Sequence, residues 1–317
     1  MSRLAESMPA AGAGYAWRNG YLLLAFTALT WGINFPIMKM GLEYSPPLLY
    51  TTLRMTIGTI TMFVIAGAMG ILRLPHRADM PVVFSVGILQ NMGFITLVTM
   101  GMQFMPAGRA AILAYTSPIW VVPAAAIFLG ERLTAPRVVG TALGLVGLMS
   151  IFNPLDVDWS SEGTLFGGSL IVLATLVWTA GLIHVRKHRW HGNVLSLISW
   201  QLLSSLVFLV PLSLIMEDTA SIRWEPGFLV NILFSGALAS GVCVAAQVGA
   251  IRSLPAVTMS LSSAAVPAVG LISSAILLGE MPGYHDVFGF LMIGLGIVLV
   301  GLTDWRLARM RASGIPR

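Results

Sequence analysis

The sequence carries little charge for its length. Only 10% of its 317 residues are Asp, Glu, Lys or Arg, against roughly 25% in an average soluble domain. Apolar residues make up 56% of the chain, and apolar runs of about 18 or more residues recur from Tyr21 almost to the C-terminus. This composition excludes a soluble globular domain and predicts an all-α integral membrane protein embedded in a lipid bilayer.

Cysteine is almost absent. The single cysteine, Cys243, excludes an internal disulfide framework and lies in an apolar run, where we expect a small buried side chain. The sequence also lacks a GxxxxGK[ST] motif, so we do not expect direct drive by ATP.

Acidic residues are missing from the middle third of every predicted span. All 13 lie in termini, connections or helix ends, whereas exchange of protons for organic cations generally needs a membrane-embedded carboxylate. No histidine lies in a span core, and His and acidic residues do not cluster at ligand spacing along the chain. We therefore expect no catalytic residue, no metal and no cofactor.

Ten spans can be written, with ends uncertain by about two to four residues. They cover residues 21–40, 47–71, 80–102, 107–129, 136–151, 163–184, 194–216, 227–250, 255–278 and 287–301. The chain then divides into an N-terminal segment (1–20), a first five-span repeat (21–152), a linker (153–162), a second five-span repeat (163–302) and a basic tail (303–317).

The distribution of Lys and Arg predicts the orientation. Fourteen of the 18 lie in the terminal segments and in alternate connections, and such an excess marks the cytoplasmic side. We expect both termini, including the segment 1–20 and the tail, to be cytoplasmic in a multi-pass protein of a bacterial inner membrane. Because the basic residues occupy short connections, the net positive charge does not indicate a nucleic-acid partner.

The two halves of the chain repeat each other. With a shift of 149 positions nine residues recur without a gap, and with a shift of 147 Leu29 and Trp31 fall on Leu176 and Trp178. The nine are Pro106, Ala107, Pro118, Leu129, Gly130, Glu131, Val138, Gly140 and Gly147, which fall on Pro255, Ala256, Pro267, Leu278, Gly279, Glu280, Val287, Gly289 and Gly296. An odd number of spans inverts the second copy, and inverted repeats are typical of secondary carriers.

Several of these residues also carry a family resemblance. The segment TWGINFPIMK (30–39), Arg54 in the second span, AYTSP (114–118) and LGE (129–131) resemble EamA-type members of the drug/metabolite transporter superfamily. The close of the pattern recurs at Pro267 and 278–280. The resemblance covers residues 21–301. Within the superfamily the sequence is similar to ten-helix YddG-like amino-acid exporters, and this similarity implies export or facilitated exchange of small metabolites.

Polar and aromatic residues within spans are candidates for a substrate cavity, because they are costly in lipid. They are Trp31, Asn34, Gln90, Asn91, Tyr115, Trp178 and Ser262. Bridging between helices is the alternative for the amides, membrane-interface anchoring for the tryptophans, and hydrogen bonding within its own helix for the serine. Pro118 and Pro267 can kink their helices and act as hinges, or can be structural kinks without gating.

The basic residues toward the outer side bear on the cargo. Arg54 and Arg109, with Lys39, give this side surplus positive charge, which favours a zwitterionic or anionic cargo; Arg54 can alternatively extend its charge to the interface. Spans six to ten contain no Lys or Arg, which disfavours phosphorylated cargo.

Two further features are assigned structural roles. Glu131 and Glu280 are predicted to end their spans, each in a Gly-Glu pair. Glycines of the fifth and tenth spans are expected to allow tight packing, within one chain or between chains of a dimer, so we expect a monomer or a homodimer. They are Gly140, Gly144, Gly147, Gly289, Gly294 and Gly296.

The sequence therefore predicts an exporter of small metabolites, amino acids above all, by alternating access through a central cavity between the repeats. The alternatives are a proton-coupled multidrug or nucleotide-sugar exchanger and, from other classes, a membrane-embedded receptor, scaffold or enzyme.

Overall fold

The computed structural model describes residues 13–131, 133–152, 162–254, 259 and 265–312, all of them in helices and connections without a strand. Within these ranges eight helical segments are long and apolar enough to cross a membrane, and two shorter apolar helices accompany them. The predicted all-α membrane protein is therefore confirmed in this coarser form.

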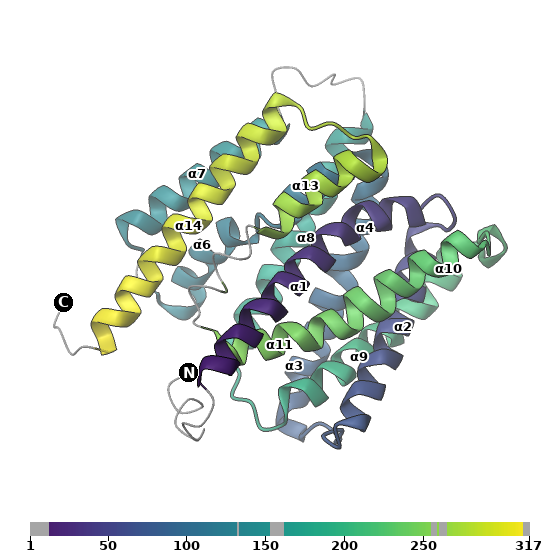
Figure 1. The fold of residues 1–317 in the computed structure, drawn as a ribbon, viewed down its shortest axis with the longest axis horizontal. Helices are drawn as coiled ribbons and strands as arrows, with labels where there is room; N and C mark the ends of the chain where they lie inside the picture. The colour runs from purple at the N-terminus through teal and green to yellow at the C-terminus, as the bar shows by residue number, and fades with distance from the viewer. Residues whose placement is uncertain (1–12, 132, 153–161, 255–258, 260–264, 313–317) are drawn as a thin grey trace.

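The helices of the first half, in chain order, are α1 (Ala13–Gly41), α2 (Pro47–Ala68), η1 (Arg77–Asp79), α3 (Met80–Ser85), η2 (Val86–Phe94), α4 (Ile95–Gly101), η3 (Met102–Phe104), α5 (Ala107–Ala114), α6 (Ser117–Leu129) and α7 (Ala135–Phe152). Those of the second half are α8 (Glu162–Lys187), α9 (Val194–Met216), η4 (Thr219–Ser221), α10 (Pro226–Leu233), η5 (Phe234–Val242), α11 (Cys243–Ser253), α13 (Ala265–Leu278) and α14 (Tyr284–Ala312). In Figure 1 the start of α1 and the end of α14 lie at the same end of the molecule.

Local sequence explains where several helices begin and end. Pro47 and Pro226 stand at the first position of α2 and α10, where a missing N–H costs nothing. Gly130 and Gly279 follow α6 and α13 with φ of 66° and 69°, the left-handed conformation that glycine adopts freely at a helix C-terminus. The Gly-Glu pairs end their helices as predicted.

Each half contains a π-helical segment at the equivalent position. η2 continues α3 into α4, and η5 continues α10 into α11. η2 begins at Val86 and η5 at Phe234, so the two are 148 positions apart. The π-helix shifts hydrogen bonds to i→i+5 and is frequent at functional sites. The sequence analysis did not predict these segments.

The two halves interleave. α1 packs against α13, α11 and η5, and α8 packs against η2, α4 and α6. α2 contacts η5 and α9 contacts η2 in the same way. The first two helices of each half therefore pack on later helices of the other half, so the core lies between the halves rather than within each one.

The long helix pair α7 and α14 lies at one side of the molecule (Figure 1). A Cβ at Gly140 would meet the Gly296 carbonyl oxygen at 2.8 Å, and a Cβ at Gly147 would meet that of Gly289 at 2.7 Å. The earlier glycine of one helix faces the later glycine of the other, so the two equivalent helices run antiparallel. The predicted tight packing occurs within the chain.

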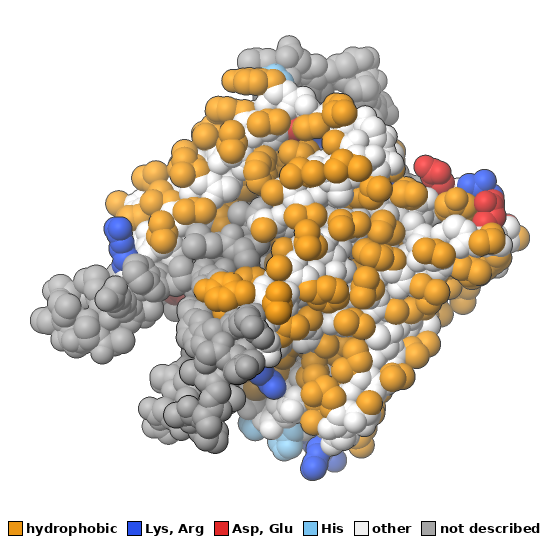
Figure 2. All heavy atoms as spheres, in the orientation of Figure 1, with side chains coloured by type: hydrophobic (Ala, Val, Ile, Leu, Met, Phe, Trp, Pro, Cys, Tyr) orange, Lys and Arg blue, Asp and Glu red, His pale blue; other side chains and the backbone are white. Residues whose placement is uncertain are grey.

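The outer surface suits a hydrocarbon environment. Figure 2 shows hydrophobic side chains across the middle of one face, with charged side chains at its margins. Large apolar side chains are mostly exposed in several helices, among them Val64, Ile127, Val207 and Ile276. Such a surface would be unfavourable in water and is stable against lipid.

Candidate functional site

A buried polar network joins α1, α2, α10 and η5. Ser235 Oγ donates to Oδ1 of Asn34 at 2.9 Å and lies 2.8 Å from the Tyr50 hydroxyl. That hydroxyl donates to Oδ1 of Asn231 at 2.9 Å, and Asn231 Nδ2 donates to the carbonyl oxygen of Ile37. The predicted residue Asn34 thus bridges the two halves, one of the two roles considered for it.

Trp31 contacts the same π-helix. Its Nε1 donates to the carbonyl oxygen of Ala239 at 3.0 Å, and its ring is half-buried. In the i→i+5 pattern carbonyls of η5 are displaced from the regular α-helical ladder. Trp31 and Asn34, one turn apart on α1, therefore both bind η5.

Arg54 lies beside this network. Its side chain is only 4% exposed, so it does not extend to a surface. One terminal nitrogen lies 2.8 Å from Met38 Sδ, the other donates to Ser240 Oγ at 3.0 Å, and Nε has no hydrogen-bond partner among the described residues. Ser240 in turn donates to the Ser235 carbonyl at 2.7 Å.

A second group lies where η2 meets α8. Gln90 Nε2 approaches the Trp178 carbonyl oxygen at 3.4 Å, and the Trp178 ring packs on Phe94 with centroids 4.9 Å apart. Asn91 is partly exposed and makes no hydrogen bond with a residue that the structure describes. Trp178 thus occupies the place in the second half that Trp31 occupies in the first, on a first helix packed against a π-helix.

Tyr115 stands at a break in the fourth predicted span. α5 ends at Ala114 and α6 begins at Ser117, so Tyr115 and Thr116 lie between the two helices. Pro118 follows, and because it has no N–H it cannot continue the helical ladder across this point. The Tyr115 ring packs edge-on against Phe35 of α1, with centroids 6.4 Å apart.

The remaining predicted residues lie elsewhere or outside the description. Arg109 pairs with Asp286 through two bonds of 2.7 and 3.2 Å. Pro267 is buried in α13. Ser262 lies outside the described residues. Among the residues described, no side-chain hydrogen bond or ring contact joins the Trp31 and Asn34 group to the Gln90 and Trp178 group.

Sequence reasoning missed four members of the buried network. Tyr50, Asn231, Ser235 and Ser240 are all buried, yet they were not assigned to a cavity. A signal was present, because Asn231 is an amide within an apolar run and Ser235 and Ser240 are five positions apart. That spacing places two side chains on one face only in a π-helix, which the α-helical periodicity did not predict.

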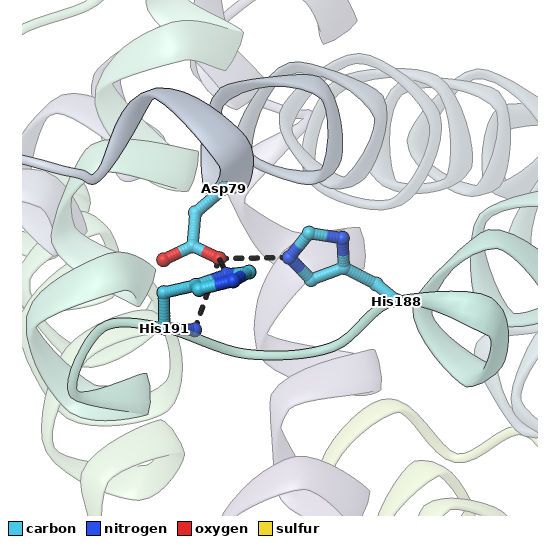
Figure 3. A group of neighbouring side chains, drawn as sticks. All are labelled: Asp79, His188 and His191. Atoms are coloured by element: carbon cyan, nitrogen blue, oxygen red, sulfur yellow. Dashed lines mark hydrogen bonds and ion pairs between the residues drawn. The ribbon is translucent and has the colours of Figure 1, made fainter.

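Asp79 of η1 faces His188 and His191, which lie in the connection between α8 and α9 (Figure 3). Asp79 Oδ1 lies 2.8 Å from His188 Nε2 and 3.2 Å from His191 Nδ1, and Oδ2 accepts from the Gly192 N–H at 2.9 Å. We expected no such cluster at ligand spacing. The structure corrects this expectation: Asp79 lies more than 100 positions in sequence from the two histidines, which are themselves three positions apart.

The ligand atoms of this cluster lie within 4.8 Å of one another, which is close enough for a metal ion. However, both Asp79 oxygens already accept hydrogen bonds. The two connections and the last turn of α8 also carry five Lys and Arg residues, which oppose cation binding. The arrangement instead joins η1, which precedes α3, to the connection between α8 and α9. A similar connection between the halves occurs at the other end of the bundle, where the Glu217 carboxylate accepts hydrogen bonds from the N–H groups of Leu48 and Leu49 at the start of α2.

Comparison with known proteins identifies the family. An uncharacterized transporter of Bacillus subtilis, YoaV, is 28% identical over 87% of this chain and 94% of its own. A probable terminal-alkyne amino-acid exporter of Streptantibioticus cattleyicolor is 26% identical over 92% of this chain and 96% of its own. A probable amino-acid metabolite efflux pump of Salmonella typhimurium is also 26% identical, over 92% of this chain and 98% of its own.

A protein of known crystal structure shares the fold, with a TM-score of 0.64 at 18% identity over 93% of this chain and 99% of that one. The EamA-like transporter family matches twice, over residues 18–153 and 165–302. Because these matches cover most of the sequence, the chain belongs to the EamA-like transporter family.

Proposed function

We propose that this protein exports amino acids or similar zwitterionic or anionic solutes across the bacterial inner membrane. Two relatives that match over nearly their whole length are described as a probable amino-acid exporter and a probable amino-acid metabolite efflux pump. The buried basic residue Arg54 and the neutral amides and hydroxyls around it are compatible with such a cargo.

The proposed architecture has ten spans in two inverted repeats, 21–152 and 163–302, with both termini cytoplasmic. The antiparallel packing of α7 on α14 supports the inversion. The position of the α1 start and the α14 end at one end of the molecule supports an even number of spans. A central cavity then lies near the middle of the membrane, where the halves meet.

The observation that carries the proposal is the polar contact between α1 and η5. Here Asn34 and Trp31 of one half bind Ser235 and Ala239 of the other, so movement between the halves changes these bonds. In the proposed open state Trp31, Asn34 and Tyr115 face the cargo from one side, and Gln90, Asn91 and Trp178 from the other. Neutral hydrogen bonds and aromatic faces replace the cargo's lost hydration.

Transport in this proposal is facilitative, with the halves rocking about hinges near Pro118 and Pro267. The support is the absence of a carboxylate from the middle of every predicted span, since such a group normally binds the driving proton.

Counterflow with purified protein in liposomes tests the function. Labelled amino acid should enter vesicles preloaded with unlabelled amino acid, without ATP, a partner protein or a proton gradient. Accumulation only when a proton gradient is imposed would contradict the proposal that transport is facilitative. No flux of any tested solute would favour the receptor or scaffold alternative.

A further inference from the structure

Arg54 is a buried cation that no carboxylate of the described chain neutralises. It lies seven residues after the first residue of α2, roughly 10 Å along the helix axis. Its described neighbours are neutral, namely the thioether of Met38 and the hydroxyl of Ser240. A cation at this depth is unfavourable unless an anion compensates its charge.

Arg109 and Lys39, the other two basic residues considered for the cargo, have partners that account for them. Arg109 forms its two-bond pair with Asp286. Lys39 donates to the carbonyl oxygens of Met102 and Met105 at 2.6 and 2.7 Å, where a helix ends, and a cation is favourable at that position. Arg54 alone among the three is held by a sulfur atom and one hydroxyl.

The guanidinium has unused donors. It carries five N–H bonds in a planar fork. Within the described part of the chain it has one oxygen acceptor and one sulfur acceptor, and its buried Nε has no partner. Sulfur is a weak acceptor. The remaining donors match the two oxygens of a carboxylate, which arginine binds through paired hydrogen bonds.

The site also lies at the contact between the two halves. Gly236 of η5 packs on the backbone of α2, where an added Cβ would lie 2.9 Å from the Arg54 carbonyl oxygen, and Gly58 packs in the same way on Ser240. These glycines hold α2 and the π-helix in close register. Arg54 therefore contacts groups from both halves, Met38 of the first and Ser240 of the second. The contact between α2 and η5, which buries Arg54, must change during alternating access.

We propose that Arg54 binds the carboxylate group of the cargo, so that transported solutes carry a free carboxylate. This inference rests on the proposed function and narrows it to one chemical class. Asn34 and Ser235 are linked to Arg54 through Ser240 and supply neutral hydrogen bonds to the remainder of the solute.

The test compares free acids with their carboxamides. Proteoliposome counterflow is measured with a labelled panel of L-amino acids, lactate and pyruvate, and the unlabelled free acid and unlabelled carboxamide of each transported solute then compete for uptake. For the wild-type protein we expect the acid to compete at least tenfold better than the carboxamide. Arg54→Gln should abolish this preference, and Arg54→Lys should retain only part of it, because an ammonium lacks the planar fork.

Arg252→Gln is the matched control, because Arg252 is an exposed arginine at the end of α11 and its loss should leave the preference unchanged. Equal competition by acid and carboxamide in the wild type would overturn the inference, even if Arg54→Gln failed to fold. So would an unchanged preference in a folded Arg54→Gln variant. Transport of lactate or pyruvate but no amino acid would support the inference and exclude amino acids from the proposed cargo, whereas transport of no carboxylate at all would overturn both proposals.

Discussion

At the scale of single residues, the polar side chains in the spans fall into two kinds. Most threonines of α2 bond to a carbonyl of their own helix, as Thr52, Thr56 and Thr59 do, and such bonds hold no other element. Asn34 and Ser235 instead bond across the two halves. Only bonds of the second kind change when the halves move relative to each other. Residues that form them are therefore the first to substitute in a test of function.

We expect Asn34→Ala to weaken cargo binding by about 1 to 3 kcal/mol, or roughly 5- to 150-fold, because a buried polar group is left without its partner. Tyr115→Ala should weaken binding as well, through the loss of an aromatic wall. Equilibrium binding of the transported amino acid to purified protein measures both. Thr56→Ala, whose hydroxyl bonds within α2, is the control, and wild-type affinity in both cavity variants would show that the cavity is misplaced.

We expect Asp79→Ala to lower the free energy of unfolding by roughly 1 to 3 kcal/mol, because this buried carboxylate is the acceptor for the Gly192 N–H and the largely buried His188 imidazole. Thermal unfolding in detergent measures the effect. Asp218→Ala, at an exposed aspartate that accepts from a single N–H, should cost less. A zinc-dependent rise in the wild-type melting temperature that His191→Ala abolished would contradict the hydrogen-bonding role and indicate a metal site.

At the scale of helices, the two halves share two structural features, a π-helix and closely packed glycines. A π-helix stands in the third predicted span of each, and a glycine pair lies at each end of the α7 and α14 contact. The glycine pairs let the two helix backbones approach each other without intervening side chains, and such close packing stabilises helix pairs in lipid through dispersion contacts. The breaks and close contacts also mark the places where a substitution should act on movement or assembly.

We expect Gly296→Leu to destabilise the protein by about 1 to 3 kcal/mol or more, since even a Cβ there would lie 2.4 Å from the Gly140 carbonyl oxygen. Gly294→Leu is a closely matched control, because a Cβ at Gly294 meets nothing within 4 Å. Melting temperature and monodispersity in detergent distinguish the two variants. Equal stability of both would mean that α7 and α14 do not pack as described.

We expect Pro118→Ala to slow turnover by on the order of tenfold, which corresponds to a barrier change of about 1.4 kcal/mol, with binding affinity nearly unchanged. Alanine restores an N–H and allows α5 and α6 to join across Tyr115 and Thr116. Counterflow rate and equilibrium binding are compared with those of Pro123→Ala, at a proline inside α6. A Pro118→Ala variant with a wild-type rate would leave the break as a purely structural kink.

At the scale of the whole molecule, the interleaved packing makes neither half a separate unit. α1 and α2 pack on η5, while α8 and α9 pack on η2, so each half completes the core of the other. An exchange of access from one side to the other then requires both halves to change their contacts together. The orientation in the membrane decides which end opens to the cytoplasm.

We expect a C-terminal alkaline phosphatase fusion to be inactive and a C-terminal green fluorescent protein fusion to be fluorescent, because the excess of Lys and Arg places both termini in the cytoplasm. A phosphatase inserted in the connection 217–225 should be active and serves as the control. High phosphatase activity at the C-terminus would reverse the assigned orientation.

Class, periodicity and duplication follow from the sequence alone. The apolar runs, the positions of the basic residues and the constant offset between halves are properties of the linear chain, because lipid imposes span length and charge placement on each segment separately. Trp31 and Asn34 were selected for a similar reason, since a polar group within an apolar run is costly wherever it lies. The ends of α6 and α13 at the Gly-Glu pairs were also predicted from the sequence, whereas the positive φ of Gly130 and Gly279 comes from the structure.

Only the tertiary structure decided which helices meet. The apolar faces of these helices are alike, so the sequence does not specify that α1 packs on η5, or that Asp79 reaches His188 and His191. The π-helices were hidden because a one-residue change in hydrogen-bond register leaves composition unaltered. Arg54 could be predicted as a cation within a span, but whether a carboxylate neutralises it depends on every neighbouring helix. The lack of such a partner among the described residues is the observation on which the proposed cargo class rests.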